Sequence, residues 1–470
     1  MREIATVVCI VGILGLYVCD REREVRASKA LWIPVVWLFI AGSRPVSMWL
    51  GITPASSNDQ YLEGSPFDRN VFLILLIVGL IVLIRRGPQA GRLLRENGPI
   101  LLFLLYGLLS ILWSDYPGVG FKRWVKAVGD LSMVLIVLTD LDPAAAVRRL
   151  LARTGFLLIP LSVLFIKYYP QLGRELSRGW GTMYSGVTTQ KNSLGEICLV
   201  FGLASLWRLA QAYGNRGDAR RKQRLIAHSA ILAMTLWLLW MSNSMTSLSC
   251  FLIAGGLMMA MHRPSLTRKP ALVHPLVLAM LSVSLFALFF DSGGSLVGTL
   301  GRDTTLTGRT DIWKTVLSMA ESPFFGTGFE SFWLGNRVET ARSTMHMQGL
   351  NEAHNGYLEV YLNLGWFGVV LLAMIIVTGY RKVVGAFRQN PDTGRLWLAY
   401  FVAGVVYNLT EVGFRPTSAS WLVFLMAIVA IRHAPETVSL PVHINHEDSV
   451  GECEQEIGQA LSVPLRQESF

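Results

Sequence analysis

Long apolar stretches alternate with short polar ones along almost the whole chain. A bilayer core of about 30 Å is crossed by about 20 helical residues. With 52% hydrophobic and only 16% charged residues, the chain lacks the charged surface of a soluble domain. The pattern predicts an all-α polytopic membrane protein with about 12 to 13 transmembrane helices. The candidate spans are residues 4–19, 31–50, 70–84, 99–113, 124–139, 154–169, 193–210, 225–241, 245–261, 272–290, 356–379, 396–411 and 417–431.

Lys and Arg residues are concentrated in alternate connections between these spans. Those connections hold 25 of the 42 basic residues, and the positive-inside rule assigns them to the cytoplasm. The transmembrane domain then comprises residues 1–433, and residues 291–355 form one long periplasmic loop within it. The net charge of +10 reflects this topology, so we expect membrane lipids and no nucleic acid as partners. Residues 434–470 carry seven acidic residues and little apolar content, which predicts a disordered cytoplasmic tail.

Basic and aromatic residues gather in two segments of the predicted outer face. Guanidinium groups match phosphate oxygens with paired hydrogen bonds, so these segments favour a phosphate-linked sugar as ligand. The alternative is that the cations contact lipid headgroups. The residues are Lys167, Arg174, Arg178, Lys191, Trp180 and Tyr184 in the first segment, and Arg302, Arg309, Lys314, Arg337 and Arg342 in the second.

Two histidines, His346 and His354, fall on the predicted outer face. His354 stands where the long loop enters a span, and helical spacing would place Tyr357 and Tyr361 on the same face. An imidazole titrates near pH 6.5, which suits a general base. A capping or interfacial histidine is the alternative. A zinc site of His346, Glu352 and His354 would have a spacing that matches no familiar ligand pattern, so no metal is expected.

Ionisable residues inside spans are candidates for function. Lys126 and Asp130 lie four residues apart on one predicted helix face and can neutralise each other. A structural pair and a ligand site both remain open for these two residues. Glu196, and Glu411 with Arg415 around the last outer turn, are similar candidates.

Four segments carry a resemblance to a known family. GRTDIWKTVLSMAESPFFGTGFESFW, followed by EAHNGYLEVYLNLGWFGVVLL, resembles the signature region of the O-antigen ligase and O-antigen polymerase superfamily. LWSDYPGVGFKRW and RGWGTMYSGVTTQKNSLGE resemble the exopolysaccharide polymerases of the ExoQ type. The resemblance covers roughly residues 100 to 430. One departure is MSNSMTSLS, where many ligases carry Ser-Arg and this chain has no arginine.

The resemblance implies a GT-C-like glycosyltransferase of the bacterial inner membrane, metal-independent, without cofactor, inverting, and active at the periplasmic face. The implied donor is undecaprenyl-pyrophosphate-linked glycan, and the implied partners are a flippase and a chain-length regulator. His354 would activate the acceptor hydroxyl, and Arg309 and Arg178 would hold the pyrophosphate. The candidate substrate-binding residues are Arg178, Arg174, Lys191, Asn192, Asn355, Tyr357 and Arg415.

Three functions remain open after these observations. A polymerase would join repeat units into exopolysaccharide or O-antigen. A ligase would move the glycan onto lipid A-core by nearly the same chemistry. A flippase or other transporter is the third reading, for which cations facing a central cavity and inverted repeats would be expected. The cations and His354 instead gather on one predicted surface, which favours the polymerase and ligase readings.

Overall fold

The computed structural model describes residues 1–21, 27–52, 64–177, 181–263, 270–290, 305–347 and 349–429. These residues form helices and one antiparallel pair of strands. The α-helices are α1 (Arg2–Cys19), α2 (Trp32–Ala41), α3 (Val46–Trp49), α5 (Pro66–Arg85), α6 (Gly87–Glu96), α7 (Gly98–Leu109), α8 (Pro117–Leu138), α9 (Pro143–Tyr168), α10 (Pro170–Gly173), α11 (Lys191–Gly214), α12 (Arg221–Ser242), α13 (Met245–Ala260), α15 (Val273–Phe290), α16 (Thr305–Ser318), α17 (Asn336–Met345), α18 (Gly356–Gln389), α19 (Pro391–Tyr407) and α20 (Ala419–Val429). The strands are β1 (Arg174–Ser177) and β2 (Gly181–Tyr184), and three short 3-10 helices are η1 (Lys29–Leu31), η2 (Ser110–Trp113) and η3 (Pro270–Leu272).

Helix starts follow local sequence signals. Proline is the first residue of α5, α8, α9 and α19, where its fixed φ suits the first turn and its missing N–H is no loss. The Asp142 carboxylate caps α9 by accepting the Ala145 N–H at 2.9 Å. The Asn390 amide oxygen does the same for the first turn of α19. The starts of these four helices are therefore encoded by residues at or next to each start.

Six helices in the described part are long and apolar enough to cross a membrane, namely α1, α5, α9, α11, α12 and α18. The pair α6 and α7, continued by η2, is bent by 86° and passes the same test when taken as one span. Shorter apolar helices include α13 and α20. The chain is thus an all-α polytopic membrane protein.

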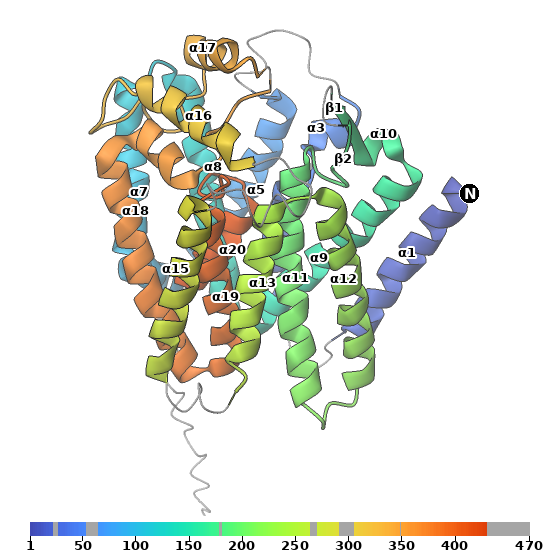
Figure 1. Ribbon diagram of the computed structural model, residues 1–470. Coiled ribbons are helices and arrows are strands. Elements are labelled where there is room, and N and C mark those ends of the chain that lie inside the picture. Colours follow the sequence, from blue (N-terminus) through green and yellow to red (C-terminus); the bar gives the residue numbers. More distant parts are fainter. Residues whose placement is uncertain are drawn as a thin grey trace, which may run out of the picture. The chain divides into compact units, whose positions relative to one another are not determined.

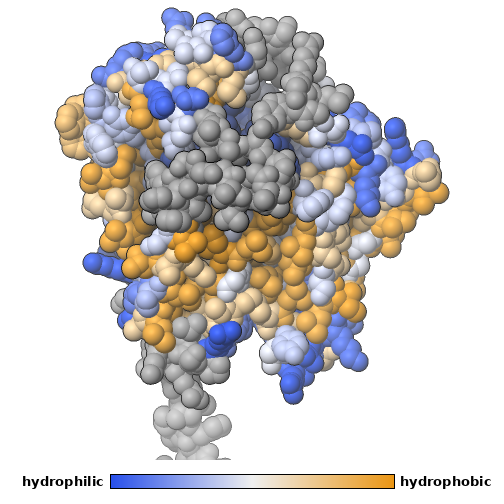
Figure 2. Space-filling model, viewed as in Figure 1, coloured by the Kyte–Doolittle hydropathy of each residue, from blue (hydrophilic) through white to orange (hydrophobic). Residues whose placement is uncertain are grey.

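The long helices run side by side, with α10, the strands, α16 and α17 at one end and the turn between α11 and α12 at the other (Figure 1). We call these the outer end and the inner end. Hydrophobic residues gather in the middle of the visible face, and hydrophilic ones lie towards both ends (Figure 2). In the interior, α11 packs against α9, α12 and α13, and α18 packs against α7, α19 and α20. This distribution is the one that a bilayer core selects.

Every candidate span predicted from the sequence overlaps a helix. The long apolar run of residues 225–261 is a hairpin, because α12 ends at Ser242 and Asn243 adopts a left-handed conformation with φ 52°. Within the predicted loop of residues 291–355, the described part contains α16 and α17. The first residues of that loop and the predicted tail of residues 434–470 lie outside the described residues.

The helix α18 is interrupted at Gly365, where φ is 63° and ψ is −164°. Residues 323–328 fill the interruption: the Gly328 N–H donates to the Asn363 carbonyl at 2.9 Å, and the Trp366 N–H donates to the Pro323 carbonyl at 2.9 Å. A Cβ at Gly365 would lie 2.2 Å from the Phe324 carbonyl carbon, so only glycine fits. This contact anchors the connection after α16 to the helix that follows His354.

Candidate functional site

His354 lies in the bend that leads into α18 and has a φ of 49°. Asn355 caps the helix, because its Oδ1 accepts the N–H groups of Tyr357 and Leu358 at 3.0 Å. The next residue is Gly356, whose N–H donates to the carbonyls of Asn408 and Glu411 at 2.9 and 3.0 Å. The backbone around His354 is therefore tied directly to the turn between α19 and α20.

The imidazole of His354 faces two carboxylates. Its Nδ1 lies 3.2 Å from Glu352 Oε1 and 3.3 Å from Glu411 Oε2. Both glutamate side chains are buried, with 7% and 4% of their surface exposed, whereas 25% of the imidazole is exposed. Two carboxylates at Nδ1 favour the tautomer that carries the proton there. The lone pair of Nε2 is then available to accept a proton from another molecule.

Each of these carboxylates is also paired with an arginine. Arg309 Nη2 lies 2.8 Å from Glu411 Oε1, and its Nη1 donates to the Thr410 carbonyl. Arg415 Nη1 donates to Glu352 Oε2 at 2.7 Å. The cluster thus holds two carboxylates, two guanidinium groups and one imidazole, and it is close to electrical neutrality while the imidazole is neutral.

The pKa of Glu411 reflects this pairing. Burial alone would raise it, but the hydrogen bond with His354 and the charge of Arg309 lower the pKa below its ordinary value. The charge of Glu352, in turn, raises the pKa of Arg415 against the effect of burial. Glu411 is therefore ionised near neutral pH and can hold the imidazole proton.

The start of α11 reaches the same cluster. Asn192 Nδ2 donates to Glu411 Oε2 at 3.1 Å, and the preceding Lys191 is the first residue of the helix. The segment before α11 is held by the buried Arg44, which donates to the carbonyls of Leu172, Gly186 and Thr188. Three connections that are far apart in sequence thus meet at Glu411.

A further buried carboxylate, that of Glu359, forms hydrogen bonds with the residue that precedes His354 and with Trp333. Glu359 Oε1 accepts the Ala353 N–H at 2.5 Å and the Trp333 Nε1–H at 2.8 Å. Trp313 Nε1 donates to the Ala353 carbonyl at 2.9 Å. These bonds fix the residue next to His354 through α16, α18 and the connection that precedes α17.

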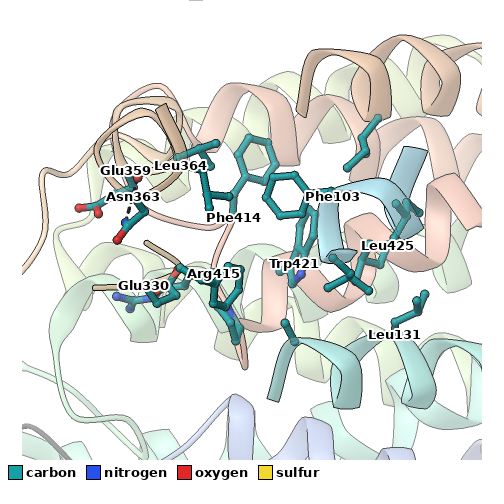
Figure 3. Close-up of a pocket in the computed structure, with 17 residues that line it drawn as sticks. Phe103, Leu131, Glu330, Glu359, Asn363, Leu364, Phe414, Arg415, Trp421 and Leu425 are labelled. Atoms are coloured by element: carbon teal, nitrogen blue, oxygen red, sulfur yellow. Dashed lines mark hydrogen bonds between the residues drawn. The ribbon is translucent and has the colours of Figure 1, made fainter. Parts of the chain in front are cut away.

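A pocket with about 600 Å³ of empty space, its open part included, lies beside this cluster. Arg415, Glu330 and Glu359 line one part of it, whereas Phe103, Leu131, Trp421 and Leu425 line the other (Figure 3). Burial raises the pKa of Glu330, and the charges of Arg123 and Arg415 offset part of that rise. Because Arg415 also bonds Glu352, one guanidinium group joins the pocket to the His354 cluster.

The structure brings together five of the nine candidate catalytic and substrate-binding residues. His354, Arg309, Arg415, Asn192 and Asn355 all lie in or beside the cluster, as the bonds above show. Arg178 lies outside the described residues.

Two of the predicted residues make contacts elsewhere. Arg174 starts β1, where its Nε donates to the Ile166 carbonyl at 2.9 Å and its guanidinium lies 5.7 Å from the centre of the Tyr184 ring. The Tyr357 hydroxyl donates to the Val405 carbonyl at 2.9 Å.

The prediction that His354 shares a helix face with Tyr357 and Tyr361 is wrong. The helix begins only at Gly356, so His354 precedes its cap and the helical spacing does not apply. The left-handed bend turns the imidazole towards Glu352 and Glu411 instead.

The group of possible metal ligands differs from the one considered from the sequence, because Glu411 stands in the place of His346. The donor atoms of Glu352, His354 and Glu411 lie within 4.8 Å of one another, so they form a group that could hold a cation. Arg309 and Arg415 already neutralise both carboxylates, and the imidazole Nδ1 is satisfied as a hydrogen-bond donor. The arrangement therefore suits a hydrogen-bonded base better than a metal ligand set.

Three site residues carried weak signals in the sequence. Glu352 was noted beside His354 in the sequence, and Glu411 was noted separately, but nothing along the chain indicates that Glu411 contacts His354. Arg44 went unnoticed, although Ser-Arg-Pro at the end of an apolar run is an unusual place for a buried arginine. The roles of Glu411 and Arg44 depend on contacts across 57 residues or more, whereas Glu352 contacts His354 from two residues away.

Comparisons with known proteins show what the chain is similar to. Residues 230–373 match the O-antigen ligase family, a region that includes Arg309, Glu352 and His354. The chain is 26% identical over 296 residues to the exopolysaccharide production protein ExoQ of Rhizobium meliloti, which is 60% of this chain and 64% of that relative. It is also 27% identical over 125 residues to an uncharacterised protein of Haemophilus influenzae, which is 26% of this chain and 30% of that relative. The family match and the similarity to ExoQ support membership of the O-antigen ligase and polymerase family.

Proposed function

We propose that the protein is an inner-membrane glycosyltransferase that polymerises undecaprenyl-pyrophosphate-linked repeat units at the periplasmic face. The observation that carries the proposal is the imidazole of His354, held by Glu352 and Glu411 with its second nitrogen directed away from them. A sugar hydroxyl has too high a pKa to ionise near neutral pH, so it needs a positioned base, worth about 10²- to 10⁴-fold in rate.

In the proposed reaction, His354 Nε2 takes the proton of the acceptor hydroxyl. The hydroxyl oxygen then bonds to the anomeric carbon of the donor while the bond from that carbon to the pyrophosphate oxygen breaks. One displacement inverts the configuration, and Glu411 stabilises the imidazolium that forms. No metal or other cofactor takes part in this scheme.

Cationic groups near His354 suit the leaving pyrophosphate. Arg309 has five N–H donors, of which Thr410 and Glu411 each accept one in this structure. Asn192 donates to the other oxygen of the Glu411 carboxylate, and Lys191 precedes Asn192 at the start of α11. We assign Arg309, with Arg178 and Lys191, to the charge that develops on the leaving group. Asn192, Asn355 and Arg415 would line the same site, with Arg174 and Tyr357 at its margin.

The pocket beside Arg415 supports a donor that carries a lipid. Its lining changes from charged groups to aromatic and aliphatic side chains, which matches a ligand with an anionic head and an apolar tail. Membrane lipids are the other partners proposed. A flippase and a chain-length regulator would act beside the enzyme.

A ligase that transfers glycan to lipid A-core is the second candidate. The family matched by residues 230–373 is named for ligases, whereas ExoQ is named for exopolysaccharide production. The cluster around His354 suits either acceptor, because both offer a sugar hydroxyl.

The test is reconstitution of the purified protein with lipid-pyrophosphate-linked oligosaccharide as sole substrate, with and without a chelator. We expect a ladder of products that persists with the chelator and disappears in His354→Ala. A shift of added lipid A-core by one glycan, without a ladder, would identify a ligase. Undiminished product in His354→Ala would contradict the proposed base, and loss with chelator that a divalent ion restores would contradict metal independence.

A further inference from the structure

Glu330 has a carboxylate that the proposed reaction does not use. It lies in the connection between α16 and α17 and lines the pocket beside Arg415 (Figure 3). Among the described residues, the charges of Arg123 and Arg415 act on this carboxylate, but no hydrogen bond reaches its oxygen atoms. The other carboxylate of the lining, that of Glu359, already accepts two hydrogen bonds. Glu330 is therefore the carboxylate of this pocket that is open to a ligand.

Hydrogen bonds on both sides of Glu330 fix its backbone in a left-handed conformation, with a φ of 52°. The Phe329 N–H donates to Ser110 Oγ at 3.0 Å, and the Ser331 N–H donates to Asn363 Oδ1 at 2.7 Å. A residue other than glycine keeps such a conformation only where its surroundings impose it, and residues of this kind cluster at functional sites. The direction in which the Glu330 side chain leaves the backbone is thus set by its neighbours.

Two arginines lie near Glu330. Arg123 Nη1 donates to the Glu330 carbonyl, and the charges of Arg123 and Arg415 oppose the rise in the pKa of Glu330 that burial causes. Arg415 donates to Glu352 at 2.7 Å, and Glu352 lies 3.2 Å from the imidazole of His354. Two side chains, a guanidinium group and a carboxylate, therefore connect Glu330 to the proposed base.

The chemistry of this carboxylate limits what can bind there. An ionised carboxylate accepts hydrogen bonds and donates none, and it repels the phosphate oxygens of a donor. Its partner on a ligand therefore carries an O–H or N–H group and is not the pyrophosphate. In a lipid-pyrophosphate-linked glycan, the hydroxyls of the sugar attached to the pyrophosphate are the nearest such groups. Phe329 and Phe414 also line the pocket, and a few polar groups among aromatic ones fix the orientation of a ligand.

We propose that Glu330 is a specificity-determining residue that accepts a hydrogen bond from one hydroxyl of the sugar next to the pyrophosphate of the donor. This inference rests on the proposed function, because it takes the donor to be a lipid-pyrophosphate-linked glycan. A donor whose sugar presents no hydroxyl at that position leaves the carboxylate without a partner and binds more weakly. Glu330 selects the donor and takes no part in making or breaking bonds.

The experiment measures how tightly the full-length His354→Ala variant, which keeps the donor unreacted, binds five undecaprenyl-pyrophosphate-linked monosaccharides. The reference probe carries glucose. The mannosyl, allosyl, galactosyl and 6-deoxyglucosyl probes each change one hydroxyl, at C2, C3, C4 and C6. We expect one of the four to bind about 30-fold more weakly than the glucosyl probe, as for the loss of a hydrogen bond to a charged group. With Glu330→Ala added, all five affinities should agree within about threefold.

The matched control is Glu321→Ala, which removes an exposed carboxylate of the same connection and should leave the difference between the probes unchanged. A full difference in Glu330→Ala, an equal loss in the control, equal affinities before Glu330 is changed, or no binding of any probe would overturn the inference. If Glu330→Ala fails gel filtration, Glu330→Met fills a similar volume without an acceptor and should show the same collapse.

Product formation by the unaltered protein tests the proposed function separately. A product ladder without a difference in affinity between the probes would overturn the role of Glu330 alone. A difference that depends on Glu330, without any product, would contradict the proposed transfer and support the role of Glu330 in binding.

Discussion

Replacing both carboxylates that face His354 should inactivate the protein far more than replacing either one. In Glu411→Gln, Glu352 Oε1 still lies 3.2 Å from Nδ1 and can keep the imidazole proton there. In Glu352→Gln, Glu411 Oε2 at 3.3 Å does the same. A hydrogen bond to a charged group contributes about 1.5–3 kcal/mol, but the remaining carboxylate replaces most of it, so each single variant should lose about tenfold in rate.

The double variant has no carboxylate at Nδ1. An amide N–H of either glutamine can then donate to that nitrogen, which moves the proton to Nε2 and removes the base. We expect a loss of about 10³- to 10⁴-fold, more than the roughly 100-fold product of the two single effects. The excess measures how far the two carboxylates substitute for each other.

The assay is the initial rate of glycan transfer by purified variants, compared at equal amounts of monodisperse protein. Glu339→Gln, an exposed carboxylate on α17, serves as the control and should keep full activity. Retention of activity in the double variant would refute the orienting role of the carboxylates. A double effect equal to the product of the single ones would refute their redundancy.

Three further predictions concern charge and topology. Arg309→Lys should raise the KM for the lipid-linked donor about tenfold, because an ammonium group lacks the planar fork; an unchanged rate at limiting donor would argue against the phosphate role. The pKa of Glu411 in the folded protein lies below its ordinary value of 4.5. The ionised Glu411 therefore stabilises the fold above pH 4.5, and this contribution is lost as the pH falls through the folded-state pKa. Between neutral pH and about pH 3.5, the melting temperature of Glu411→Gln should therefore fall less than that of the unaltered protein, and equal slopes would contradict this. Ser343→Cys should react with an impermeant thiol reagent added from the periplasm while Asp218→Cys stays protected, and the reverse pattern would invert the topology.

Sequence patterns were sufficient for the membrane architecture. Apolar runs and proline starts are local signals, so each candidate span has its helix. Arg309 and His354 were also found, because the motifs that contain them are contiguous. The predicted span begins at residue 356, where α18 does begin, but extending helical spacing back to His354, which precedes the helix, misplaced the neighbours of that residue.

Partners across the fold could not be predicted in the same way. Lys126 and Asp130 have the spacing of a helical ion pair, yet Asp130 accepts hydrogen bonds from Trp37 and Thr417 at 2.8 Å. The Lys126 ammonium lies 5.3 Å from the centre of the Phe72 ring. These contacts depend on which neighbouring elements pack against each side of the helix. The spacing of two residues along one helix does not reveal those neighbours.

The interruption of α18 bears on how the protein is made. Only residues 366–389 form an unbroken helix, about 36 Å long at about 1.5 Å per residue, so this part can insert into a membrane as a span by itself. The two turns before Gly365 leave backbone groups with which residues 323–328 form hydrogen bonds. Glu411, which contacts His354, and Asn192, which bonds Glu411, come from two other connections. If a single span is inserted the wrong way, one of these connections stays on the other side of the membrane. Activity is therefore a readout of correct insertion, and a misinserted chain would carry no functioning site.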